Sequence, residues 1–219
     1  IINDYHIFVP DRHKPSDKLP TYADIPNSLK TAIKAFILTC AVRIARGQEK
    51  KHNSMLIHVT RYRTWQNHIK ELVEVLFRYY KAEIEANDTQ FIESMRDLYL
   101  NDFIPTTLDV LNVKEELNDT IIVEHAWDEI QPLLWNAVQK IEVMSINGSS
   151  ADALTYEDNK EKGISVIAIG GDKLSRGLTL EGLSISYFLR ASKMYDTLMQ
   201  MGRWFGYRPG YVDLCRLYT

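Results

Sequence analysis

Two short segments near the C-terminal end of the chain combine glycine, arginine, threonine and glutamine in a way that suits phosphate chemistry. The first follows an apolar run at 164–169 and has the sequence GGDKLSRGLT at 170–179. The second follows an apolar run at 183–189 and ends in QMGRWFGYR at 200–208. Glycine lets backbone N–H groups approach an anion closely, and arginine offers a planar fork to two phosphate oxygens. The pattern therefore predicts two phosphate-binding segments, each following a strand.

These segments resemble motifs of the superfamily 2 helicases. The loop at 173–179 looks like their motif V, and the segment at 200–208 looks like their motif VI, where Gln, Gly-Arg and a second Arg face the ATP phosphates. The two sequences KLSRGLTLEGL and QMGRWFGYRPGY together are most similar to the Z-one (Z1) domain. That family is described as an endonuclease domain and occurs in long bacterial proteins linked to restriction and defence. The likeness covers most of the chain and is densest after residue 163.

The resemblance implies roles for individual residues. Arg203, Arg208 and Gln200 would be catalytic, with one of the two arginines acting as an arginine finger. Contacts to the bound nucleotide are implied for Gly171, Lys173, Ser175, Arg176, Gly177, Thr179 and Gly202.

The spacing in the second segment departs from the usual motif VI. Gly202 follows Gln200 by two residues instead of three, and the next arginine lies five residues beyond Arg203. Five helical residues turn through about 500°, so Arg203 and Arg208 need not share a helix face. Arg203 is favoured as the finger because it directly follows Gly202, and Arg208 is second.

A third segment, MLIHVTRYRTWQNHI at 55–69, resembles helicase motif IV. The pattern predicts a short buried strand at 54–59 and then a helix to about residue 81. Thr60, Arg61 and Arg63 would lie where the strand ends, which is the edge of an open α/β sheet where ligands bind. We expect these residues, together with Arg176, to contact a nucleic-acid backbone. His58, inside the strand, is expected to be a core or edge histidine.

The pattern of elements predicts an α/β fold with a parallel sheet. The resemblance makes it a RecA-like (P-loop NTPase-like) lobe with a helical insertion. The expected parts are an irregular N-terminal segment at 1–26, the start of the lobe at 27–82, the helical insertion at 83–138 and the remainder of the lobe at 139–219. The strand-like runs lie at 54–59, 140–146, 164–169, 183–189 and 212–218.

The composition is that of an ordinary globular protein, with 45% hydrophobic residues and a net charge of −3 among 219 residues. That charge provides no global attraction for nucleic acid, although a local basic face is possible after residue 160. Cys40 and Cys215 are expected to be reduced core thiols. With no signal peptide and no run long enough to span a bilayer, we expect a cytoplasmic location without membrane contact. The chain starts without Met, and we expect it to be a fragment of a longer protein.

No GxxxxGK[ST] loop occurs in the chain, so we expect no ATP turnover by the chain alone. The resemblance implies that ATP and Mg²⁺ are bound mainly by an N-terminal RecA-like lobe of the same full-length protein. This chain would be the second lobe of an ATP-dependent translocase or helicase-like protein in restriction or defence, with DNA as the partner. No metal site is predicted in the chain itself.

Two alternatives remain open, an endonuclease domain that cleaves DNA and a lobe that binds nucleic acid without catalysis. A nuclease needs carboxylates and a lysine around Mg²⁺, and the nearest match is Asp11 with Glu49, Lys50 and Lys51. A simpler interpretation of 43–51 is a solvated basic end of a helix that begins near Asn27 or Ser28.

Overall fold

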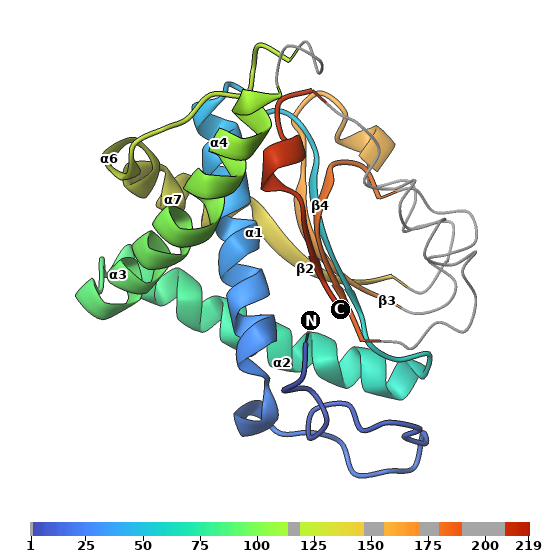
Figure 1. Ribbon diagram of the computed structural model, residues 1–219. Helices are drawn as coiled ribbons and strands as arrows, with labels where there is room; N and C mark the ends of the chain where they lie inside the picture. The colour runs from blue at the N-terminus through green and yellow to red at the C-terminus, as the bar shows by residue number, and fades with distance from the viewer. Residues whose placement is uncertain (1, 114–118, 147–155, 171–179, 190–208) are drawn as a thin grey trace.

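A five-stranded sheet organises the fold, and every strand runs parallel to its neighbours. The computed structural model describes residues 2–113, 119–146, 156–170, 180–189 and 209–219 (Figure 1). The strands lie in the order β2-β3-β1-β4-β5. The predicted α/β fold with a parallel sheet is confirmed, and it is consistent with a RecA-like lobe. The strand bounds are β1 Asn53–His58, β2 Ile141–Ile146, β3 Ser165–Gly170, β4 Leu183–Phe188 and β5 Arg216–Tyr218.

Each predicted strand overlaps an observed one, although the last is shorter than expected, because a 3₁₀ turn occupies 212–214. The longer helices gather on one side of the sheet (Figure 1). Their bounds are α1 Asn27–Ala45, α2 Arg63–Glu85, α3 Thr89–Leu98, α4 Ile104–Asn112, α6 Trp127–Ile130 and α7 Leu134–Lys140. Shorter turns are η1 Tyr22–Asp24, the π-turn η2 Tyr99–Phe103, η3 Gln131–Leu133 and η4 Val212–Leu214.

The three central strands are buried on both faces, as parallel strands usually are. Successive side chains alternate between two cores. Met55 and Ile57 of β1 belong to the large core under the helices, whereas Leu56 belongs to a smaller core on the opposite face. The same alternation holds in β3, whereas in β4 Leu183 and Ile185 belong to different cores, next to a register shift between β1 and β4.

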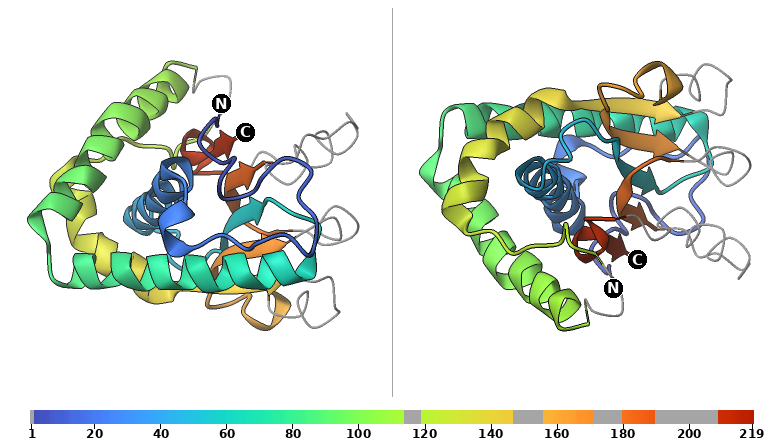
Figure 2. Two further views of the ribbon diagram at one scale, coloured as in Figure 1. Left: turned by 90° about the horizontal axis from the view of Figure 1, so that it is seen from below. Right: turned by 90° about the horizontal axis from the view of Figure 1, so that it is seen from above.

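Helix α1 is buried on more of its surface than its sequence suggests. The spacing of Leu29, Ile33, Phe36 and Cys40 predicts one apolar face, yet Ala35, Leu38 and Thr39 are also buried. Figure 2 shows the reason, since α1 is seen nearly end-on with the sheet on one side and helices around the others, of which α6 and α7 pack most closely against it. A helix enclosed in this way has no solvated face, so single-face periodicity is the wrong model for it.

The helices between α2 and β2 pack onto the same core as the sheet. The aromatic residues that these helices contribute to the core are buried or partly buried, and they include Phe91, Tyr99, Phe103, Trp127 and Trp135. Asn87 separates α2 from α3 and has a positive φ of 51°. Pro105 does not break the chain into separate helices, because it lies in the first turn of α4, where its missing N–H costs no hydrogen bond. Residues 121–123, which have strand-like sequence, form no strand.

Residues 2–26 contain no helix or strand beyond the short η1 turn. Phe8 and Val9 nevertheless anchor this segment in the core, and the N–H of Ile2 donates to the carbonyl of Thr219 at 2.8 Å. Within the described ranges, no helix is both long and apolar enough to cross a membrane. The two cysteines are free, and burial raises the pKa of the Cys40 thiol to about 12 and that of Cys215 to about 11.

A buried ion pair joins the C-terminal end of α1 to the η4 turn before β5. The two terminal nitrogens of Arg46 each donate to one carboxylate oxygen of Asp213 at 2.7 Å, and the hydroxyl of Thr107 in α4 donates to the same carboxylate. The Arg46 side chain is 1% exposed and that of Asp213 is 0% exposed. Arg43 is also buried. The expected solvated basic helix end is therefore wrong for Arg43 and Arg46, whose neighbours supply hydrogen-bond acceptors, and holds for the exposed Lys50 and Lys51.

We predict that Asp213→Asn lowers the free energy of unfolding by on the order of 3 kcal/mol, because it leaves the Arg46 charge buried without its counter-charge. The exposed Asp109→Asn on α4 is the matched control and should change stability by less than about 0.5 kcal/mol. Urea unfolding of both variants measures the difference. Equal stability of the two variants would show that the pair does not hold α1 to the η4 turn.

Candidate functional site

The predicted phosphate-binding and nucleic-acid-binding residues follow three strands that are neighbours in the sheet. The strands β3, β1 and β4 lie side by side, and all three end at the same edge because they are parallel. Thr60, Arg61 and Arg63 follow β1 directly. The segment 171–179 follows β3, which ends at Gly170, and the segment 190–208 follows β4 by two residues. We call this the carboxyl edge.

Most of the predicted site residues lie outside the described part of the chain. They are Gly171, Lys173, Ser175, Arg176, Gly177, Thr179, Gln200, Gly202, Arg203 and Arg208. Their roles in nucleotide binding and catalysis therefore stay predictions. The strands before them end where the sequence predicts, and Thr60, Arg61 and Arg63 can be located directly.

Thr60 is buried at the carboxyl edge and its hydroxyl is engaged inside the protein. The Oγ1 atom lies 2.7 Å from Nε2 of His13 and accepts the backbone N–H of Tyr62 at 3.2 Å. The other ring nitrogen of His13 lies 3.0 Å from the carbonyl of Pro10, which can only accept. In the tautomer that satisfies all three contacts, the His13 proton is on Nδ1 and the Thr60 hydroxyl donates to Nε2. The Thr60 hydroxyl thus connects the N-terminal segment to the end of β1 through His13.

Arg61 and Arg63 are exposed beside Thr60, and both are available to an external partner. The guanidinium of Arg61 lies 5.0 Å from the ring centroid of Tyr62 and donates to its hydroxyl at 3.0 Å. This contact orients the Arg61 side chain without burying its charge, whereas Arg63 opens helix α2. The pair therefore gives the carboxyl edge an accessible positive charge.

His58 packs in the sheet, as expected for a core histidine. It is 5% exposed, and its ring stacks on Phe188 of the neighbouring strand β4 with the ring centroids 4.7 Å apart. This contact packs the ends of β1 and β4 together just before both strands reach the carboxyl edge.

The residues considered for a nuclease centre do not come together. Asp11 lies two residues from His13, at the carboxyl end of β1, whereas Glu49 pairs with Lys140 at 2.6 Å, at the amino end of β2. A six-residue strand of about 20 Å separates the two edges, far beyond the reach of one metal ion. Over the described ranges, no group of three or more His, Cys, Asp or Glu side chains could hold a metal ion.

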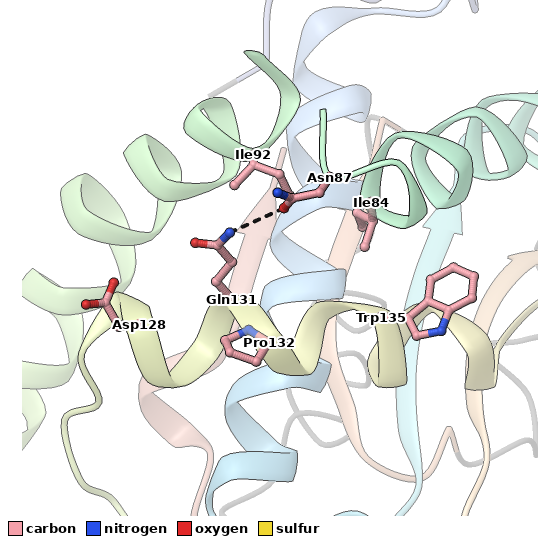
Figure 3. Close-up of a pocket in the computed structure, with 7 residues that line it drawn as sticks. All are labelled: Ile84, Asn87, Ile92, Asp128, Gln131, Pro132 and Trp135. Carbon is pink, nitrogen blue, oxygen red and sulfur yellow. Dashed lines mark hydrogen bonds between the residues drawn. The ribbon is translucent and has the colours of Figure 1, made fainter. Parts of the chain in front are cut away.

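A pocket of about 420 Å³ lies in the helical layer, away from both sheet edges (Figure 3). Ile84, Ile92 and Trp135 line it, and Gln131 donates to the side chain of Asn87 at 3.4 Å. Asp128 is the one charged residue among the described residues that line it. A lining with a carboxylate and no cation does not fit a phosphate group.

Sequence reasoning missed a polar network at the opposite edge of the sheet, where the strands begin. Arg43 donates to Gln48 Oε1 and to the backbone carbonyl of His52, both at 2.8 Å, and its guanidinium stacks over the ring of Tyr211 at 4.2 Å. The sequence does carry a signal for the neighbouring pair of Arg46 and Asp213. Asp213 lies within an apolar run, and an acid in such a run needs a partner when it is buried.

Comparison with known families gives one match. A family model for the Z1 domain matches residues 28–219, which include α1 except for its first residue, the whole sheet and the described helices between them. Comparisons with curated proteins and with solved structures gave no match.

We predict that Thr60→Val loosens the N-terminal segment, because the valine can neither bond His13 nor accept the N–H of Tyr62. Trypsin should cleave after Arg12 and Lys18 faster than in the wild type, and unfolding free energy should fall by about 1–2 kcal/mol. Thr64→Val, at an exposed position in α2, is the control. Unchanged cleavage rates would show that the hydroxyl does not hold this segment.

Proposed function

The chain belongs to the Z1 domain family, and from this premise we propose that it is the C-terminal RecA-like lobe of an ATP-dependent nucleic-acid translocase or helicase-like protein. We place that protein in bacterial restriction or defence. The lobe supplies an arginine finger to ATP bound chiefly by a first RecA-like lobe, and it contacts the backbone of DNA.

One observation carries this proposal. The segment that resembles motif IV contains most of β1 and continues past its end, and the segments that resemble motifs V and VI follow β3 and β4. These three strands occupy adjacent positions in the sheet. In open parallel sheets, ligands bind outside the carboxyl ends of the strands. Segments more than 100 residues apart in the sequence thus leave the sheet from three adjacent strand ends. A helicase-like lobe requires its motifs to lie close together in this way.

The residues of this chain suit a supporting role in ATP hydrolysis. The sequence lacks a Walker loop, and no cluster of three metal-ligating side chains occurs among the described residues. In this proposal the first lobe holds Mg²⁺. Phosphoryl transfer from ATP to water would supply the free energy. An arginine of this lobe would place positive charge where negative charge develops on the phosphate, which lowers the barrier without a covalent step.

The exposed pair Arg61 and Arg63 would contact phosphates of the nucleic-acid backbone. Such contacts position a strand without reading its sequence, as a translocase requires. The endonuclease alternative has no comparable support, because Asp11 and Glu49 lie at opposite edges of the sheet.

We predict that Arg203→Ala in the intact protein lowers kcat for ATP hydrolysis by about 10³-fold and leaves KM almost unchanged. Arg208→Ala should have the smaller effect of the two. A finger acts on the transition state more than on bound ATP, and this difference separates it from a binding residue. The exposed Arg78→Ala on α2 is the control, and thermal melts verify folding. Wild-type kcat in both folded variants would contradict the finger assignment.

We predict that Arg61→Ala weakens DNA binding by the intact protein and reduces the slope of log affinity against log salt by about 1. Adding Arg176→Ala should reduce affinity and slope further, because each arginine neutralises a separate phosphate. Affinity is measured by fluorescence anisotropy at several salt concentrations, with Arg78→Ala again as the control. A lower affinity with an unchanged slope would mean that Arg61 acts on folding and not on the phosphates.

A further inference from the structure

A second pocket, of about 490 Å³, lies at the amino edge of the sheet, where the strands begin. Lys51 and His52 directly precede β1, Gly182 directly precedes β4, and Arg43 reaches the pocket from the C-terminal part of α1. The length of β1, about 20 Å, separates this amino-edge pocket from Thr60 and Arg61. The pocket is therefore distinct from the carboxyl edge.

The lining of the amino-edge pocket is strongly basic. Its charged or titratable side chains, apart from the phenol of Tyr211, are Arg43, Lys50, Lys51, Lys160, His52 and Glu181. Within the described part of the chain, Lys50 and Lys51 are exposed and make no ion pair, whereas Lys160 pairs only loosely with Glu157 at 3.4 Å. Four cations thus face one carboxylate.

Two other pockets lined by described residues have no such excess. The pocket in Figure 3 has one carboxylate and no cation among its described lining residues. A third pocket, of about 460 Å³, combines Lys30 and Lys34 with Glu83 and Asp88, so its charges cancel. The positive charge at the amino-edge pocket is therefore a local feature of a chain whose net charge is −3.

The walls of the amino-edge pocket are held rigidly. Gly182 has a φ of 68°, and a Cβ there would lie 1.8 Å from the carbonyl oxygen of His52, so the two segments touch through their backbones. The same carbonyl accepts from Arg43, whose Nε bonds Gln48. A preformed wall lowers the ordering cost when a ligand binds.

We propose that the amino-edge pocket binds a phosphate group carried by a small molecule of about nucleotide size. Lysines hold phosphate as mobile point charges, and Arg43 adds a fixed positive charge behind them. Ile121, Pro209 and Tyr211 add apolar surface for the rest of the ligand. The volume falls within the range of small-molecule sites, and the lining combines cations with apolar side chains, which suits a phosphate ester of nucleotide size.

His52 and Glu181 complete the pocket with a neutral ring and one carboxylate. The Nδ1 atom of His52 accepts the backbone N–H of Ile164 at 3.2 Å, which keeps its proton on Nε2, 3.8 Å from Glu181. Burial lowers the pKa of His52, with Arg43 and Lys51 adding to the effect and Glu181 and Glu157 opposing it. His52 can therefore act as a neutral Nε2–H donor toward a ligand at neutral pH.

The test uses inorganic pyrophosphate as the probe and the intact protein. Lysine acetylation, mapped by mass spectrometry, should be slowed by pyrophosphate at Lys50, Lys51 and Lys160. Lys162 is exposed nearby but does not line the pocket, so its acetylation should not change. This readout locates the site even if pyrophosphate also binds elsewhere on the protein.

Titration calorimetry then compares two double variants. Lys50→Gln with Lys51→Gln should weaken the pyrophosphate binding that protects these lysines by about tenfold or more, whereas the control, Lys18→Gln with Lys162→Gln, should bind as the wild type does. Absence of protection, or equal affinity in both variants, would overturn the proposal. Protection by a single-stranded oligonucleotide but not by pyrophosphate would also overturn it, and would assign these lysines to a nucleic-acid surface.

Discussion

The common direction of the five strands is the constraint on which the arrangement depends. In a parallel sheet each connection must return the chain from the edge where one strand ends to the edge where the next begins. The molecule therefore has two chemically different edges. The carboxyl edge receives the segments that leave β1, β3 and β4, and the amino edge receives the turns that enter them. Both candidate sites follow from this division.

The amino edge is held together by polar contacts as much as by apolar packing. Arg46 and Asp213 connect α1 to the turn before β5, and Asp119 accepts the backbone N–H of Gly210 at 2.6 Å. Gly210 has a φ of 88°, which other residues rarely adopt, and a Cβ there would lie 2.2 Å from Nε2 of Gln48, so that this side chain would have to move. Such contacts need defined geometry on both sides, so they fix the relative position of α1, α4 and the end of the chain more strictly than apolar contacts would.

Local patterns predicted the strands and the long helices well, because short apolar runs and helical spacing express burial directly. They failed where burial depends on distant neighbours. The face of α1 that turns away from the sheet is covered mainly by the helical stretch 127–140 together with α3, and Arg46 is buried because Asp213 lies beside it. No local rule contains that information, since the partners are 167 residues apart.

The candidate site was predictable in part for the same reason. Motif resemblance identified which strands matter, and the sheet order brings their ends together, which a sequence alone does not specify. Motif resemblance did not indicate that the Thr60 hydroxyl hydrogen-bonds His13, because residues 1–26 carry no regular pattern from which to place them. The amino-edge pocket was missed because its lining comes from six separate stretches of the chain.

The central position of β1 also bears on how the chain acquires its structure. Its two neighbours, β3 and β4, are made late, and the side chains of Asn53 and Ser165, which touch across the sheet, are 112 residues apart. During synthesis β1 must therefore stay unpaired on both edges until more than half of the chain has followed it, while α1 has no sheet to cover. Long-range pairing of this kind slows folding and prolongs the exposure of apolar surface on the ribosome. The stretch from α1 to β1 is where a nascent chain would most need protection by chaperones.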